Sequence, residues 1–135
     1  MSLKRERIQP EKLYVRGGSK PLYSHVTAIE GGRKLIFISG QVARDAAGNV
    51  VGKNDMRAQI RQVGENIKAA LEAAGASLSD LVKTTTFVTD IEEFFKHADV
   101  RSEYFGDAMP TSATVEVKRL AGPEFMIEIQ AMAIV

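Results

Sequence analysis

The stretch of this sequence that most constrains its fold is Leu35-Ile-Phe-Ile38, a run of four apolar, β-prone residues. Successive side chains of a strand point to opposite faces, so this strand presents two apolar side chains on each face. A strand of this kind has to be covered on both sides. Only two helices are predicted, and they can cover one side. We therefore expect a second copy of the chain to cover the other, and ligands commonly bind in the clefts that such interfaces create.

Length and composition narrow the class of protein. The 135 residues suffice for one hydrophobic core, so we expect a single domain over residues 1–135 with an irregular N-terminal arm at 1–22. The net charge of +1, without a Lys/Arg-rich run, argues against a nucleic-acid partner. No apolar run approaches the ~20 residues of a membrane-spanning helix, and the first residues lack the apolar core of a signal peptide. We expect no membrane partner and a cytoplasmic location.

Two strand-like runs near the N-terminus predict a hairpin. Ser24–Glu30 and Arg33–Ser39 are separated by the pair Gly31-Gly32, which is typical of a tight turn between antiparallel strands. In the arm before them, at most one short strand is expected, near residues 12–15.

The C-terminal part predicts a second hairpin. Residues 113–119 and 126–135 alternate between apolar and polar residues with period two, and a Gly-Pro turn signal at Gly122 separates them. A hairpin centred on Gly122 would place Glu116 opposite Glu128. Like charges in that position repel, so the face that carries them should reach solvent, a cation or a ligand.

The middle of the chain predicts a long amphipathic helix. Asn54 or Asp55 is a suitable N-cap, and Gly75 is a suitable C-terminal stop. Apolar residues recur between them at spacings of three and four, which is the pattern of one buried helix face. They are Met56, Ile60, Val63, Ile67, Leu71 and Ala74.

A β-branched strand is predicted at Val82–Thr89, followed by a turn and a second helix from about His97 or Asp99 to Phe105. The order of elements is two strands, helix, strand, helix, two strands. It predicts an α+β fold with a mainly antiparallel sheet and both helices on one face.

The residues that remain for chemistry are few. His25 and His97 stand alone without the spacing of a metal site, cysteine is absent, and no phosphate-binding or nucleophile-elbow motif occurs. We therefore expect no metal, and dinucleotide binding, phosphoryl transfer and hydrolysis by an elbow serine have no support in the sequence. The polar candidates are Tyr23, Ser39-Gly40-Gln41, Ser112, Glu116 and Glu128, and each of them taken alone also has a purely structural explanation.

Several motifs in register resemble the reactive intermediate deaminase family (RidA, also YjgF, or endoribonuclease L-PSP). They are Ser39-Gly40-Gln41, Gln59 through Asn66 to Ala73-Ala74-Gly75, Asp80 to Val88 with Asp90 and Phe94, Val115-Glu-Val117 and Ile127-Glu-Ile129. The match runs from about Tyr23 to Ala133. The resemblance implies a chorismate-mutase-like fold assembled as a homotrimer, with a small-molecule ligand bound in clefts between subunits.

The resemblance also implies cofactor-free hydrolysis of reactive imines or enamines. The family's water-positioning glutamate corresponds to Glu128, which is the expected catalytic residue. The expected substrate-binding residues are Tyr23, Ser39, Gly40, Ser112 and Thr114.

At two positions the sequence departs from the family's pattern. The arginine that clamps the substrate carboxylate, two residues after Pro110, is replaced by Ser112, and the cleft asparagine falls at Ala98. The resemblance therefore implies weak or no activity on imino acids. A non-catalytic trimer that binds a metabolite or has a regulatory role is the alternative. Endoribonuclease activity is a minor one, which the nearly neutral charge disfavours.

Overall fold

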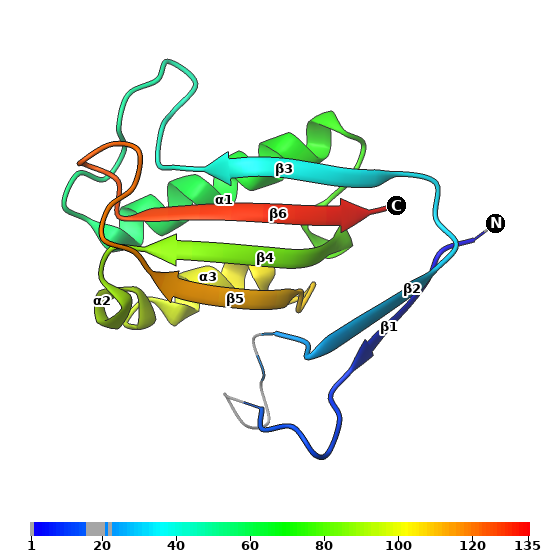
Figure 1. Ribbon diagram of the computed structural model, residues 1–135. Coiled ribbons are helices and arrows are strands. Elements are labelled where there is room, and N and C mark those ends of the chain that lie inside the picture. The colour runs from blue at the N-terminus through cyan, green and yellow to red at the C-terminus, as the bar shows by residue number, and fades with distance from the viewer. Residues whose placement is uncertain (1, 16–20, 22) are drawn as a thin grey trace.

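The computed structural model describes residues 2–15, 21 and 23–135, and within them the chain has the predicted α+β fold. In sequence order the elements are β1 (Lys4–Ile8), β2 (Val26–Glu30), β3 (Leu35–Gln41), α1 (Met56–Ala73), a 3₁₀ turn (Leu78–Asp80), β4 (Leu81–Val88), α2 (Ile91–Phe95), α3 (Ala98–Phe105), β5 (Thr111–Glu116) and β6 (Ile127–Ile134). Figure 1 shows the helices behind one face of a sheet and the β1–β2 ribbon beside it. The structure also contains α2, a short helix where a turn was expected.

The main sheet has the strand order β3-β6-β4-β5. β6 is antiparallel to both β3 and β4, whereas β5 is parallel to β4. The predicted C-terminal hairpin is therefore wrong, because β4 lies between β5 and β6 (Figure 1). Glu116 lies opposite Val88, and Glu128 lies opposite Phe87. The last strand takes the central place because its alternate residues are apolar enough to lie under the helices, whereas β5 remains at the edge.

The predicted hairpin of the two N-terminal runs is also wrong. β2 pairs with β1, and β3 pairs with β6, so the two runs belong to different sheets. Gly31 and Gly32 have φ angles of 80° and 92°, a conformation that glycine adopts readily, and the chain does turn there. The strand in the N-terminal segment lies at Lys4–Ile8 rather than near residues 12–15. Residues 1, 16–20 and 22 of the predicted arm lie outside the described residues.

The long helix is confirmed. Asp55 is its N-cap, and the Asp55 carboxylate accepts a hydrogen bond of 3.1 Å from the Ala58 amide. The helix ends at Ala73, and Gly75 follows with a φ of 78°. Five of the predicted apolar positions are buried: Met56, Ile60, Val63, Ile67 and Leu71. None of the helices in the described part of the chain is long and apolar enough to cross a bilayer.

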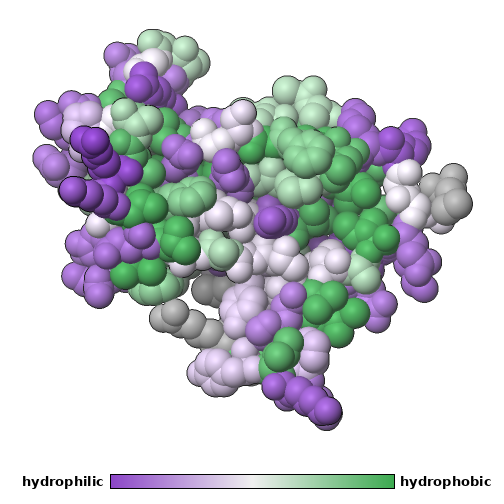
Figure 2. Space-filling view, viewed as in Figure 1, coloured by the Kyte–Doolittle hydropathy of each residue, from purple (hydrophilic) through white to green (hydrophobic). Residues whose placement is uncertain are grey.

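The two faces of the main sheet differ in what covers them. Ile36 and Ile38 are each 8% exposed and belong to the core under the helices. On the opposite face Leu35 is 52% and Phe37 is 71% exposed, and Figure 2 shows apolar side chains gathered over this side of the molecule. The strand is thus apolar on both faces, as predicted, and the chain itself covers only one. We call the uncovered side the open face.

Candidate functional site

Glu128 on β6 lies directly against Gly40 near the end of β3. A Cβ placed at Gly40 would overlap the Glu128 carboxylate group, so only glycine leaves room for this approach. The pairing of β3 with β6 shifts register between Ile38 and Gln41, which is the irregularity that includes Gly40. Ser39 precedes this glycine and is exposed on the open face. Three of the predicted site residues therefore meet at one end of the open face.

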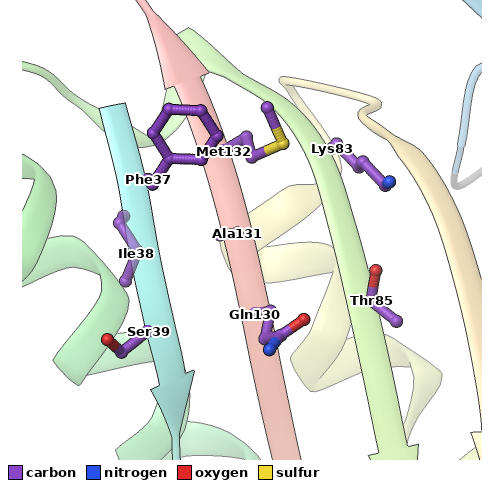
Figure 3. A pocket seen from close by; sticks show the side chains of 8 residues that line it. All are labelled: Phe37, Ile38, Ser39, Lys83, Thr85, Gln130, Ala131 and Met132. Carbon is purple, nitrogen blue, oxygen red and sulfur yellow. The ribbon is translucent and has the colours of Figure 1, made fainter. Parts of the chain in front are cut away.

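A hollow on the open face lies beside this group. Its volume is about 310 Å³, and it is lined by Phe37, Ile38, Ser39, Lys83, Thr85, Gln130, Ala131 and Met132. Figure 3 shows these side chains on the adjacent strands β3, β6 and β4. Gln130 lies two residues from Glu128 and faces the same side of β6. The hollow thus combines apolar walls with two hydroxyls, an amide and the Lys83 amine, a combination suited to a small polar ligand.

Sequence analysis did not select Lys83, Thr85 or Gln130. Lys83 is exposed in a strand otherwise rich in threonine and apolar residues, and that contrast was a signal available in the sequence. Gln130 carried no comparable signal, because an alternating strand ordinarily has a polar residue at such a position.

Ser112 and Thr114 face the other side of the sheet. They lie beside Thr84 and Thr86 of β4, which are each 1% exposed beneath the helices. Ser112 Oγ accepts hydrogen bonds from Thr84 Oγ1 at 3.3 Å and from Arg101 Nη2 at 3.2 Å. Within one chain, Ser112 and Thr114 therefore do not share a face with Glu128.

Arg101 is a functional candidate that sequence analysis missed. It is the fourth residue of α3 and only 7% exposed, and its guanidinium carbon lies 5.9 Å from the centre of the Phe105 ring. Burial lowers the pKa of Arg101, because the charged guanidinium loses hydration. Ala98, where the sequence analysis expected the position of the family's asparagine, is the first residue of the same helix.

Tyr23 lies in the segment before β2, near the start of β5. Its hydroxyl donates to the Tyr14 carbonyl at 3.4 Å, and its ring meets the His25 ring edge-on at 5.3 Å. The next residue, Ser24, donates its amide to the Pro110 carbonyl at 3.3 Å. Tyr23 therefore belongs with Ser112 and Thr114, and the predicted site residues form two groups on different sides of the chain.

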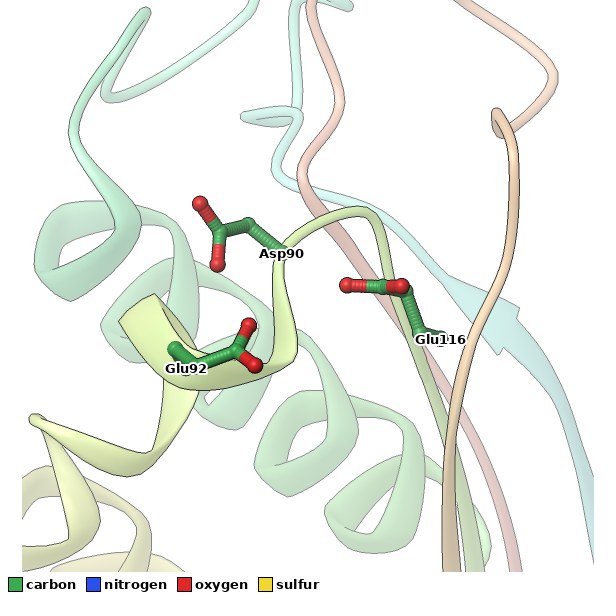
Figure 4. A group of neighbouring side chains, drawn as sticks. All are labelled: Asp90, Glu92 and Glu116. Carbon is green, nitrogen blue, oxygen red and sulfur yellow. The ribbon is translucent and has the colours of Figure 1, made fainter.

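Three exposed carboxylates, those of Asp90, Glu92 and Glu116, come within 4.8 Å of one another (Figure 4). Helix capping explains two of them. Asp90 accepts a hydrogen bond from the Glu93 amide at 3.0 Å, and Glu116 accepts one from the Ile91 amide at 3.1 Å. Glu116 thus serves the start of α2 and does not form the acidic pair with Glu128 that the sequence suggested.

Comparison with known proteins agrees with these features. The family model described as Endoribonuclease L-PSP matches residues 18–135. A RutC family protein from Pyrococcus horikoshii is 42% identical over 123 residues, which cover 91% of this chain and 96% of the relative. A 2-iminobutanoate/2-iminopropanoate deaminase from Salmonella typhimurium is 38% identical over 103 residues, which cover 74% of this chain and 79% of the enzyme.

The fold is also found among solved structures. The Rid family protein YyfB from Yersinia pestis superposes with a TM-score of 0.84 at 34% identity, over 97% of this chain and 98% of that one. The family match, the sequence relatives and the fold agree. The chain therefore belongs to the endoribonuclease L-PSP family, which is the RidA/YjgF family that its motifs resemble.

Proposed function

We propose that this protein is a cofactor-free hydrolase of reactive imines or enamines, in which Glu128 orients water and accepts its proton. The observation that carries the proposal is the Glu128 carboxylate held against Gly40 beside a hollow with polar groups. The carbon of an imine is already electrophilic, so the protein mainly has to position a water and supply a proton acceptor. The relatives named as 2-iminobutanoate/2-iminopropanoate deaminases support this class of reaction.

We further propose that the active form is a homotrimer. Leu35 and Phe37 are large apolar residues on the open face, and a partner subunit would cover them. A cleft between copies would also bring Ser39, Gly40 and Glu128 of one chain next to Tyr23, Ser112 and Thr114 of another. This arrangement would reunite the predicted site residues that a single chain holds apart.

The test is an assay with freshly generated amino acid imines, followed by release of the keto acid or by semicarbazone trapping. Glu128→Gln keeps the shape of the side chain and removes the base, so turnover should fall by about 10²- to 10⁴-fold. Glu116→Gln is the matched control, because it changes a carboxylate that caps α2 and should retain activity. Full activity in Glu128→Gln would contradict the proposed role.

The second candidate is a trimer that binds a metabolite without converting it. The specific observation in its favour is Ser112 in place of the expected arginine. Thermal-shift screening of small ligands, run together with product detection, separates the two candidates. A ligand that raises the melting temperature and is never consumed would favour the binding role. Ribonuclease activity is disfavoured by the net charge of +1, since RNA binding relies on basic surfaces.

A further inference from the structure

β2 and β3 each have a strand on one side only, and little protects their other edge. Within the described residues β3 is the first strand of the main sheet and β2 is the last strand of the ribbon. Edge strands usually carry charges or proline, which prevent pairing with other chains. The edge strand β1 is mostly charged and the edge strand β5 is mostly polar. β3 has no charged residue, and β2 has only Glu30, at its end. These two edges are therefore the ones that need a partner.

The side chains of β2 and β3 match in an antiparallel register, which is the one that a two-residue turn at Gly31-Gly32 would define. In that register Val26 lies opposite Phe37. Two residues further on, Ala28 lies opposite Leu35. Directly opposite residues share a face of the sheet, so these four side chains would form one apolar cluster at the border of the open face. In the single chain Val26 is 39%, Leu35 is 52% and Phe37 is 71% exposed. Pairing of the two edges would cover all three.

Contacts within the chain hold its own ribbon away from the edge of β3. Arg5 Nη2 donates to the Ile134 carbonyl at 2.8 Å, and Arg7 Nε donates to a carbonyl in the loop before β5. Gly32, between β2 and β3, is packed: a Cβ there would lie 3.1 Å from Ile134 Cδ1 and 3.2 Å from Leu3 Cδ1. The ribbon consequently crosses the end of the main sheet, while the outer edge of β3 lies on the other side of the molecule (Figure 1).

We propose that the free edge of β3 is an interaction surface for the β1–β2 ribbon of a second copy of this chain. β2 of one copy pairs antiparallel with β3 of the next, and main-chain hydrogen bonds join the ribbon and the main sheet across the interface. The contact uses different surfaces of the two copies, so it is head-to-tail and is able to close into a ring. The inference rests on the proposed assembly, within which it specifies one contact, and it does not depend on hydrolysis.

The competing explanation is a hairpin within one chain, in which the ribbon breaks the contacts of Arg5 and pairs with its own β3. Such a hairpin would cover the same apolar side chains, so a change in exposure does not distinguish the two explanations. They differ in which chains the strand pair joins. The sequence contains no cysteine, so a pair of introduced cysteines reports this directly. Opposite residues of antiparallel strands have Cα atoms about 4.5–5.5 Å apart, which a disulfide can span.

The test uses Val26→Cys and Phe37→Cys in separate full-length chains that carry tags of different size and are refolded together. Mild oxidation should link the two kinds of chain to each other. Val26→Cys mixed with Phe95→Cys is the matched control, because Phe95 is 40% exposed but lies on α2, outside both strands. The Val26–Phe37 pair should be linked about tenfold more than the control or better, since a fixed contact raises the effective concentration of the two thiols.

A chain with both substitutions completes the test. Pairing between copies should link it into disulfide-bonded oligomers, whereas a hairpin within one chain would give a disulfide-bonded monomer. That monomer would overturn the inference, as would an unlinked mixture or equal linking in the control. Thermal melting identifies variants that fail to fold, and Ala28→Cys with Leu35→Cys is the replacement pair in the same register. Light scattering on the wild type measures the assembly independently, so a trimer without the disulfide would remove only the strand pairing.

Discussion

The carboxylate of Glu128 lies against the backbone of Gly40, at the point where the pairing of β3 with β6 shifts register. Two strands far apart in the sequence thus fix the position of the proposed base. Such irregularities are over-represented beside active sites, because they redirect a side chain. Glycine at position 40 keeps the carboxylate close to the backbone and beside the hollow.

Gly40→Ala should therefore reduce imine hydrolysis while the chain remains folded. The added methyl group would overlap the Glu128 carboxylate and push it from its place. Steady-state kinetics and circular dichroism measure the two effects separately. Arg33→Ala, at an exposed position just before β3, is the control for a small change near the same strand, and its effect should be smaller. Wild-type kinetics in Gly40→Ala would show that this contact does not position the base.

Gly64→Ala should destabilise the protein, although alanine is normally the better helix residue by about 0.5–1 kcal/mol. Gly64 lies in the middle of α1, and a Cβ there would overlap the ring of Tyr104 on α3. Forcing an extra methyl group into such a contact costs about 1–3 kcal/mol. Urea unfolding measures the change. In Tyr104→Ala the same glycine substitution should become neutral or stabilising, and a cost that persists there would refute the steric explanation.

Phe37→Asp should dissociate the proposed homotrimer. Phe37 is 71% exposed on the open face, and a carboxylate placed there would lose its hydration in a subunit interface. Light scattering coupled to size exclusion measures the mass. Phe95→Asp is the matched control, because Phe95 is 40% exposed on α2, away from the open face. A wild-type monomer at micromolar concentration would reject the trimer itself.

Acid should weaken the contact between α1 and α3. Arg57 Nη1 and Nη2 donate to the Asp99 carboxylate at 3.1 Å and 2.7 Å, and these bonds hold the pKa of Asp99 below its usual value. A carboxyl group with a lowered pKa in the folded state stabilises the protein above its unfolded-state pKa of about 4. This contribution is lost as the pH falls through the lower, folded-state pKa.

Asp99→Asn should accordingly show a smaller drop in melting temperature between pH 7 and pH 3 than the wild type. The effect should be small and should shrink further in high salt, because both side chains are exposed. Asp107→Asn, at an exposed site just after the helix, is the control for removing one acidic group. Identical pH profiles for wild type and Asp99→Asn would contradict the assigned role.

Local patterns in the sequence predicted α1, α3 and the strands β2 to β6, but not β1 or α2. The spacing of apolar residues after Asp55 predicted α1, because a helix is determined largely by contacts within a few residues. Strand pairing depends on distant partners, and alternation does not specify them. The turn signal at Gly122 therefore does not show whether the strands on either side of it pair with each other. In the structure they do not, because β4 lies between β5 and β6.

The candidate site was predicted in part for the same reason. The family motifs identified Glu128 and Gly40, and the structure places them in contact. The motifs also identified Ser112, but its alignment with the family's arginine suggested only a missing charge. The contact with Arg101 joins a helix to a strand, and no pattern along the chain records it.

The central place of β6 has a consequence for how the protein folds during synthesis. β3 and β4 have their shared partner in a strand that the ribosome makes after both of them. Until β6 emerges, the facing edges of β3 and β4 present unpaired backbone groups, which are available to other chains. Completing the sheet requires contacts of large sequence separation, which form slowly. The nascent chain thus passes through a stage in which its core strands are made but open, and chaperones or neighbouring chains have access to them.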